Sequence, residues 1–123
     1  MIRDGYVARW RGLEYEASPG GGGDEVRLYT TEPMAGFEET RPGRYRCIVP
    51  VAEIEYLRYV RTACTWQGEP FTIVGEHETY LRVEYTGGRA VVAERLGLDR
   101  LDRGVWQAWA PRTEVVDLRE EII

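Results

Sequence analysis

The stretch ARWRGLEY, residues 8–15, alternates apolar and polar side chains on either side of an Arg-Gly pair. This pattern predicts a β-hairpin with a two-residue turn, in which glycine takes the position that needs a positive φ. Pairing across the turn places Trp10 and Tyr15 on one face and sets Arg9 opposite Glu14 on the other, solvated face. The face that we expect to be buried carries Tyr6, Ala8, Trp10, Leu13, Tyr15 and Ala17.

The same spacing of Trp, Gly and an aromatic residue returns in CTWQGEPF, residues 64–71. A second block also repeats without gaps, residues 36–57 against residues 97–118. Two blocks in the same order predict an internal duplication, with copy one in residues 1–57 and copy two in residues 58–123. The identical pairs in the second block are Gly36 and Gly97, Gly43 and Gly104, Pro50 and Pro111, Glu53 and Glu114, and Leu57 and Leu118.

Each copy reads as short strands with a closing unit, GRYRCIVPVAEI and GVWQAWAPRTEV, in which a strand ends at proline before a short turn or 3₁₀ helix. Together with the hairpins, these segments resemble SH3-like β-barrels. The resemblance implies an all-β protein built of two tandem, directly packed SH3-like small barrels. Residues 89–95 favour a strand, with one helical turn as the alternative. The positions three residues after the prolines hold Glu53 and Glu114 instead of the tyrosine of peptide-binding SH3 domains, so proline-rich peptides are not the expected ligand.

Composition narrows the function classes. The 123 residues carry a net charge of −5, which argues against a nucleic-acid partner because such proteins need clustered positive charge. All basic residues are arginine, which a GC-rich genome explains without a special role for arginine. No segment is apolar enough for a signal peptide or a membrane span, so we expect a cytoplasmic protein that does not bind membranes.

Few residues offer chemistry. His77, the single histidine, lies between two glutamates in a polar loop and is expected to be an exposed loop residue. Cys47 and Cys64 align with alanines of the other copy and are expected to be small core residues, not nucleophiles. The repeated Glu53 and Glu114 are expected to share a structural role, such as capping the turn after each proline. We therefore expect no catalytic residue, no metal site and no cofactor.

The remaining candidates are partner-binding residues. Alternation in the strands before the prolines turns Ile48 and Trp109 outward at equivalent positions, and Tyr56 and Tyr59 follow at the junction of the copies. An apolar residue on the solvent-facing side of a strand either packs between the two barrels or contacts a partner or a second copy of the chain. Both readings stay open here, and a homodimer is compatible with the second.

The sequence thus favours a non-enzymatic protein that binds another protein, with a basic partner best matched by the acidic charge. A small cytosolic immunity or inhibitor-type protein, or an adaptor, is the specific version. The alternative is a small-molecule-binding protein or an enzyme that uses a groove between the barrels. Its candidate residues are Tyr29, Tyr56, Tyr59 and Trp109 with Arg58 or Arg61.

Overall fold

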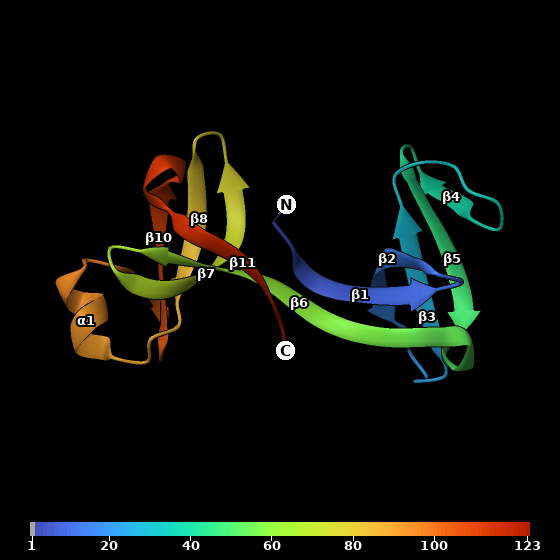
Figure 1. The fold of residues 1–123 in the computed structure, drawn as a ribbon, viewed down its shortest axis with the longest axis horizontal. Helices are drawn as coiled ribbons and strands as arrows, with labels where there is room; N and C mark the ends of the chain where they lie inside the picture. The colour runs from blue at the N-terminus through green and yellow to red at the C-terminus, as the bar shows by residue number, and fades with distance from the viewer. Residues whose placement is uncertain (1) are drawn as a thin grey trace. The chain divides into compact units, whose positions relative to one another are not determined.

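The computed structural model describes residues 2–123 and has an all-β fold with one short helix (Figure 1). This confirms the all-β part of the predicted fold class. No helix among residues 2–123 is long and apolar enough to cross a membrane. The strands are β1 (Asp4–Trp10), β2 (Leu13–Pro19), β3 (Glu25–Thr30), β4 (Glu38–Arg41), β5 (Arg44–Pro50), β6 (Ile54–Trp66), β7 (Glu69–His77), β8 (Tyr80–Tyr85), β9 (Asp99–Asp102), β10 (Val105–Pro111) and β11 (Val116–Ile122).

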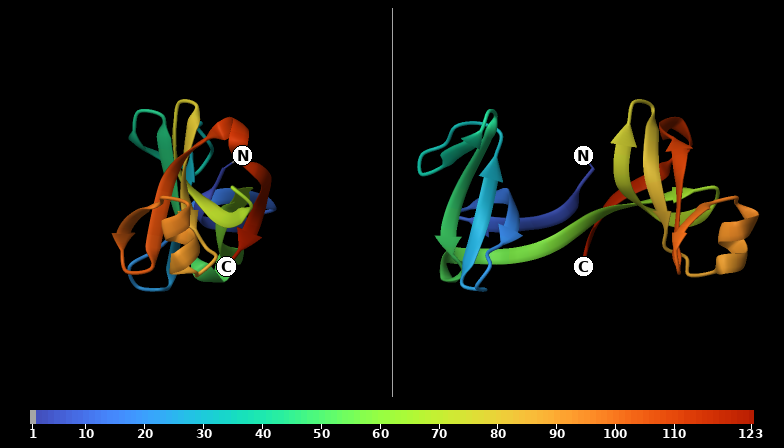
Figure 2. Two further views of the ribbon diagram at one scale, coloured as in Figure 1. Left: turned by 90° about the vertical axis from the view of Figure 1, so that its left-hand side faces the viewer. Right: turned by 180° about the vertical axis from the view of Figure 1, so that it is seen from behind.

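The strands pair along one path, β4-β5-β3-β2-β1-β6-β7-β8-β10-β9, and β11 pairs with β6. The pairs with a determined register are all antiparallel. The path runs from β4 to β9 without returning to its first strand, so the sheet is open and not closed into a barrel. Figure 2 shows β6, drawn in green, as one long strand.

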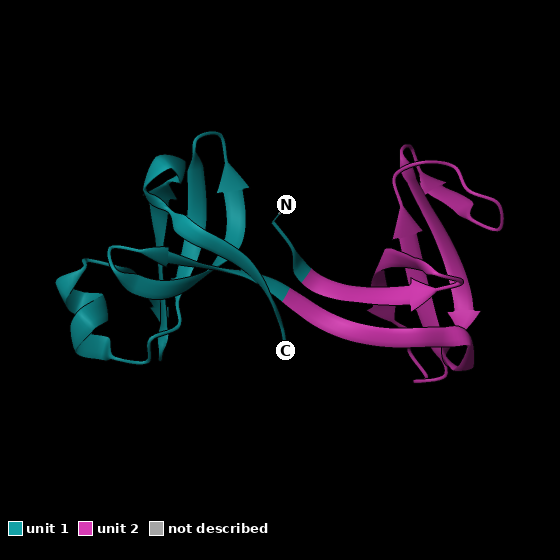
Figure 3. Cartoon of the chain, in the orientation of Figure 1, with its two compact units in different colours: residues 1–4, 61–122 teal, residues 5–60, 123 magenta. Residues whose placement is uncertain are grey.

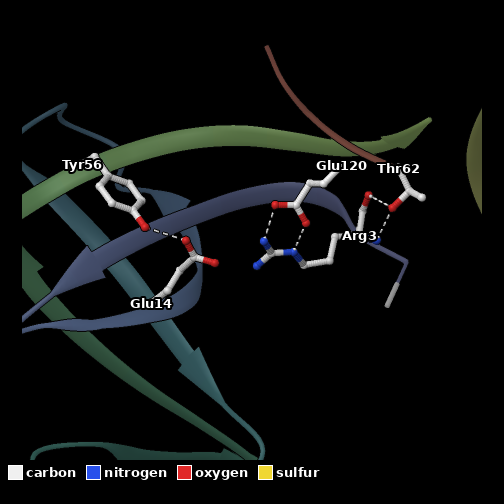
Figure 4. A network of polar contacts seen from close by, with 5 residues as sticks. All are labelled: Arg3, Glu14, Tyr56, Thr62 and Glu120. Atoms are coloured by element: carbon white, nitrogen blue, oxygen red, sulfur yellow. Dashed lines mark hydrogen bonds and ion pairs between the residues drawn. The ribbon is translucent and has the colours of Figure 1, made fainter. Parts of the chain in front are cut away.

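The chain divides into two compact units (Figure 3). Unit 2 comprises Gly5–Val60 and Ile123, and unit 1 comprises Arg61–Ile122 together with the residues up to Asp4. Strand β6 therefore supplies its first half to unit 2 and its second half to unit 1. Within unit 1, Arg3 binds the Glu120 carboxylate at 2.6 and 2.8 Å, and its backbone N–H donates to the Thr62 hydroxyl at 2.8 Å (Figure 4). These contacts tie the first residues of the chain to β6 and β11.

Both opening hairpins have the predicted register. In unit 2, Ala8 pairs with Tyr15 and Arg9 with Glu14 around the Arg11-Gly12 turn, where φ is 49° and 81°. In unit 1, Cys64 pairs with Phe71 around the Gln67-Gly68 turn, where φ is 53° and 74°. Positive φ at both turn residues is the geometry of the turn that matches the twist of the flanking strands, which explains the glycine in each motif.

Each unit has its own core. The core of unit 2 contains Ala8, Trp10, Tyr15, Ala17, Val26, Leu28 and Val49. The core of unit 1 contains Cys64, Trp66, Phe71, Ile73, Leu81, Val83, Tyr85, Val92, Ala93, Leu98, Ala110 and Val115. The predicted buried face is wrong at its edges: Leu13 is 55% exposed beside the turn and Tyr6 is 39% exposed near the start of β1. The alternation of apolar and polar residues extends to these positions, but the packed core does not.

The preference for a strand over residues 89–95 is wrong, because Ala90–Arg95 forms the helix α1. Val92 and Ala93 are buried while Val91 is 77% exposed, so adjacent residues share the buried face as a helix requires. The C-terminal end is closed by backbone hydrogen bonds from Leu96 to Val92 and from Leu98 to Ala93. The β-branched residues of this segment favour a strand, and burial against the core of unit 1 outweighs that preference.

A 3₁₀ helix follows each proline, at Val51–Glu53 and at Arg112–Glu114. Glu53 and Glu114 do share a structural role, but it is not the suggested capping, since neither 3₁₀ helix has a side-chain cap hydrogen bond. Instead, each carboxylate accepts a hydrogen bond from an indole N–H. Trp66 Nε1 donates to Glu114 at 3.0 Å, and Trp10 Nε1 donates to Glu53 at 3.4 Å. A buried tryptophan needs such a partner, which accounts for the repeated glutamate.

Candidate functional site

Trp109 projects from β10 of unit 1 and is 48% exposed. It pairs in register with Arg82 of β8, whose guanidinium lies 5.4 Å from the centre of the indole ring. The His77 ring approaches the same indole edge-on, with ring centres 6.3 Å apart. Arg82 is itself fixed by Gln107 at 3.0 Å and Asp99 at 3.3 Å. The indole is therefore held in a defined orientation on an accessible sheet face.

The other three predicted partner residues lie in unit 2. Ile48, on β5, is paired with Arg27 and is 47% exposed. Tyr59 is half-buried, with its ring edge-on to Tyr6 at 5.2 Å. Tyr56 is also half-buried and is described with the groove below. A contact of these residues or of Trp109 with a partner stays a prediction.

Unit 2 contains an acidic groove of about 450 Å³, which we define by residues 13–16, 29–32 and 34. The pairing of β2 with β3 places Glu16 beside Tyr29 and brings these segments together. The exposed side chains of Leu13 and Met34 supply apolar surface. Three glutamates, Glu14, Glu16 and Glu32, are among the residues that line the groove.

Neighbouring side chains hold two of these carboxylates in place. The Tyr56 hydroxyl donates to Glu14 at 2.6 Å, and Figure 4 shows the two side chains directed at each other. The Arg58 guanidinium stacks on the Tyr56 ring at 3.7 Å. Arg44 binds Glu16 at 3.1 Å and covers the Tyr29 ring at 4.3 Å.

Glu32 differs from the other two carboxylates. No cation of the described residues 2–123 lies within ion-pair distance of its carboxylate. The groove thus combines an unbalanced negative charge with aromatic and aliphatic walls, which suits a cationic side chain with an apolar stem.

Unit 1 contains an arginine pocket of about 460 Å³, formed where α1 faces the β9–β10 hairpin. Arg89, Arg100 and Arg103 line it together with Tyr85 and Trp106. Along the chain, α1 lies between β8 and β9, so the pocket is lined by the end of β8, by α1 and by the β9–β10 hairpin.

The cysteines and the histidine lie in different surroundings. Burial raises the pKa of the Cys64 thiol, and it also raises the pKa of Cys47, where Arg11 acts in the opposite direction. Both thiols are free, and a raised pKa keeps them protonated at neutral pH, as expected of packing residues. The His77 side chain is 72% exposed, as predicted. Among residues 2–123, no group of His, Cys, Asp or Glu side chains is arranged to hold a metal ion.

Sequence reasoning missed both concave sites. It singled out Tyr29 and Tyr56, which belong to or adjoin the acidic groove, but it did not connect them with Leu13, Glu32 or Met34. The available signal was the hairpin register, which places residues 13–16 beside the end of β3. For the arginine pocket, the signal was the extra segment that copy two carries between its repeated blocks.

These features define a small all-β protein with two cores, an acidic groove in unit 2 and an arginine pocket in unit 1. The chain belongs to the family described as uncharacterised conserved protein UCP033725, whose family model matches residues 2–122. Searches of curated proteins and of solved structures found no match to the chain.

Proposed function

We propose that the chain is a non-enzymatic protein-interaction protein that binds a basic protein through the acidic groove of unit 2. The observation that carries this proposal is the groove itself, which three glutamates line together with exposed Leu13 and Met34. The net charge of −5 adds a long-range attraction for a basic partner, which raises the association rate. The apolar walls and the Glu32 carboxylate then select an arginine or lysine side chain.

Tyr56 has a positioning role in this proposal. Its hydroxyl fixes the Glu14 carboxylate at 2.6 Å, so that this charge is held at the groove and not spread over several rotamers. A carboxylate ordered in advance loses less conformational entropy when a cation binds. Tyr56, predicted from the sequence as a partner residue, thus acts through Glu14.

The test uses the full-length chain and fluorescently labelled decapeptides that carry a central Arg, Lys or Glu in the same flanking sequence. We expect the Arg and Lys peptides to bind and the Glu peptide not to bind, as measured by fluorescence anisotropy. Glu32→Gln and Glu14→Gln should each weaken binding about two- to fivefold, the range for solvent-exposed ion pairs.

Glu38→Gln is the matched control, because it removes an exposed charge from β4 of the same unit outside the groove. If Glu38→Gln weakens binding as much as Glu32→Gln, the attraction is non-specific and the groove is not the site. If none of the cationic peptides binds, the proposal is wrong.

The immunity or inhibitor-type role is the specific form of this proposal, with an adaptor as the other form. An inhibitor covers the catalytic or functional surface of its partner, whereas an adaptor leaves it open. Titrating the chain into an assay of the partner's own activity separates the two. Loss of activity at a 1:1 ratio supports the inhibitor, and unchanged activity supports the adaptor.

We further propose that the two units are SH3-like modules that arose by duplication. The support is the strand order β6-β1-β2-β3-β5 in unit 2, with a 3₁₀ helix between β5 and β6. In unit 1, the same order recurs as β11-β6-β7-β8-β10, with a 3₁₀ helix between β10 and β11. An NMR structure of each unit within the full chain tests this, because the proposal requires the two backbones to superpose strand for strand. Different strand orders would overturn it.

A further inference from the structure

The arginine pocket concentrates positive charge in a chain whose net charge is −5. Arg89 donates to Glu69 at 3.5 Å and is thereby balanced. No carboxylate of the described residues 2–123 lies within ion-pair distance of the guanidinium groups of Arg100 and Arg103. The one acidic residue on the pocket wall is Glu94 of α1. Two unpaired cations and one carboxylate leave the cavity positive.

The position of Arg100 is set by its neighbours in the sheet. Arg100 of β9 pairs with Trp106 of β10, and its guanidinium lies 5.9 Å from the centre of the indole ring. This distance is within the range of a cation–π contact, which positions a guanidinium without using its N–H groups as hydrogen-bond donors. Arg103 lies in the turn between the two strands, next to Gly104, whose φ is 74°. Both residues of this hairpin line the same pocket.

The aligned block of unit 2 has the opposite character at the same positions. Glu39 stands where unit 1 has Arg100, and it pairs with Tyr45 as Arg100 pairs with Trp106. Hydrogen bonding to that carboxylate, then burial and charge, raises the pKa of Tyr45. Pro42 stands where unit 1 has Arg103. The strand pairing therefore forms without either arginine, and the two arginines are particular to unit 1.

Opposite these cations, the pocket wall offers groups of a different kind. Tyr85 is held by Glu69 at 3.3 Å and is packed against Gly87, where a side chain would collide with the phenol. Thr86 and Glu94 supply a hydroxyl and a carboxylate at the wall. These groups can hydrogen-bond the hydroxyls of a ligand. A volume of about 460 Å³ is within the size range of small-molecule sites.

We propose that the arginine pocket of unit 1 binds a small phosphorylated metabolite, with its phosphate held by Arg100 and Arg103. Guanidinium groups match phosphate oxygens in a two-bond fork, and a phosphate dianion balances both unpaired cations. The hydroxyl-bearing part of the ligand faces Thr86 and Glu94. This site lies in unit 1 and is independent of the protein-binding role proposed for the acidic groove of unit 2.

The experiment is an NMR titration of the full-length, ¹⁵N-labelled chain, read at the indole N–H of Trp106 and at the backbone of residues 85–106. The probes are inorganic phosphate, glucose 6-phosphate and adenosine monophosphate. Glucose and adenosine serve as neutral counterparts, and malate serves as a dianion without phosphate. We expect saturable shifts with a phosphate ester, weaker binding of inorganic phosphate, and no binding of the neutral compounds.

Arg100→Gln and Arg103→Gln should each weaken binding of the phosphate ester about 10- to 100-fold, the range for a lost charge-assisted hydrogen bond. Arg100→Glu, which installs the residue of the aligned block, should abolish binding. Arg41→Gln is the matched control, since it removes one arginine from β4 of unit 2 and should change the affinity less than twofold. The Trp106 signal of each variant in the absence of ligand reports whether unit 1 is still folded.

Three results would overturn the proposal. The first is the absence of saturable shifts with every phosphate compound. The second is equal weakening by Arg41→Gln and Arg100→Gln, which would mean non-specific attraction to positive charge. The third is binding of malate as tight as that of the phosphate esters, which would mean that the pocket accepts any small dianion and does not select phosphate.

Discussion

Removing the carboxylate of Glu114 should destabilise the fold through Trp66. The indole N–H of Trp66 donates to Glu114 at 3.0 Å, and Trp66 is only 8% exposed. A hydrogen bond to a charged group contributes about 1.5–3 kcal/mol, and the exposure of Glu114 lets water replace part of it. We therefore expect Glu114→Ala to lower the free energy of unfolding by about 1–1.5 kcal/mol.

The corresponding contact in unit 2 provides the comparison. Trp10 donates to Glu53 at 3.4 Å, near the limit for a hydrogen bond, so Glu53→Ala should cost about 0.5 kcal/mol or less. Glu114→Gln retains an oxygen acceptor and should fall between wild type and Glu114→Ala. Glu78→Ala is the neutral control, because its side chain is 79% exposed.

Urea unfolding, followed by tryptophan fluorescence and by far-UV circular dichroism, measures these changes, and coincidence of the two signals tests for a single transition. The indole N–H of Trp66 should also exchange with solvent faster in Glu114→Ala. A loss equal to that of Glu78→Ala, or a larger loss for Glu53→Ala than for Glu114→Ala, would refute the assignment of this hydrogen bond as a stabilising contact.

Three further outcomes can be checked on the same protein. Burial raises the pKa of Cys64 above the usual 9.0, so the stability that the neutral thiol contributes is complete below that value and declines as the pH rises through the shifted pKa. The urea midpoint should therefore fall less for Cys64→Ala than for wild type between pH 7 and 10.5. Parallel curves for the two proteins would contradict this. Gly87→Ala should lower stability by about 1–3 kcal/mol because its new methyl group collides with Tyr85, whereas Gly21→Ala, which meets open space, should be neutral in thermal melts. Trp109→Ala should leave the melting temperature nearly unchanged, since the indole is half exposed. The same substitution should weaken binding to any partner or second copy of the chain that uses this face. Unaltered binding in sedimentation velocity would contradict the partner role predicted for Trp109.

The features that the sequence predicts correctly depend on neighbours in the chain. A two-residue turn with glycine fixes the register of its own hairpin, so the Ala8–Tyr15 and Cys64–Phe71 pairs follow from local rules alone. Proline ends β5 and β10 for an equally local reason, because it lacks the N–H that a ladder needs.

The features that the sequence does not predict depend on distant neighbours. Residues 90–95 form a helix because Val92 and Ala93 pack on a core that the local pattern cannot reveal. The role of Glu114 depends on an indole 48 positions away. The acidic groove and the arginine pocket are likewise assembled from separated segments, so their charges meet only after the sheet has formed.

The central claim is that the acidic groove of unit 2 receives a basic side chain of a protein partner. Its most direct test is an NMR titration of the ¹⁵N-labelled chain with the Arg-centred decapeptide, mapped residue by residue. The account predicts saturable backbone shifts in residues 13–16 and 29–34, reduced in Glu32→Gln and unchanged in Glu38→Gln. Shifts confined to other surfaces, such as the sheet face around Trp109, or the absence of saturable shifts would contradict it.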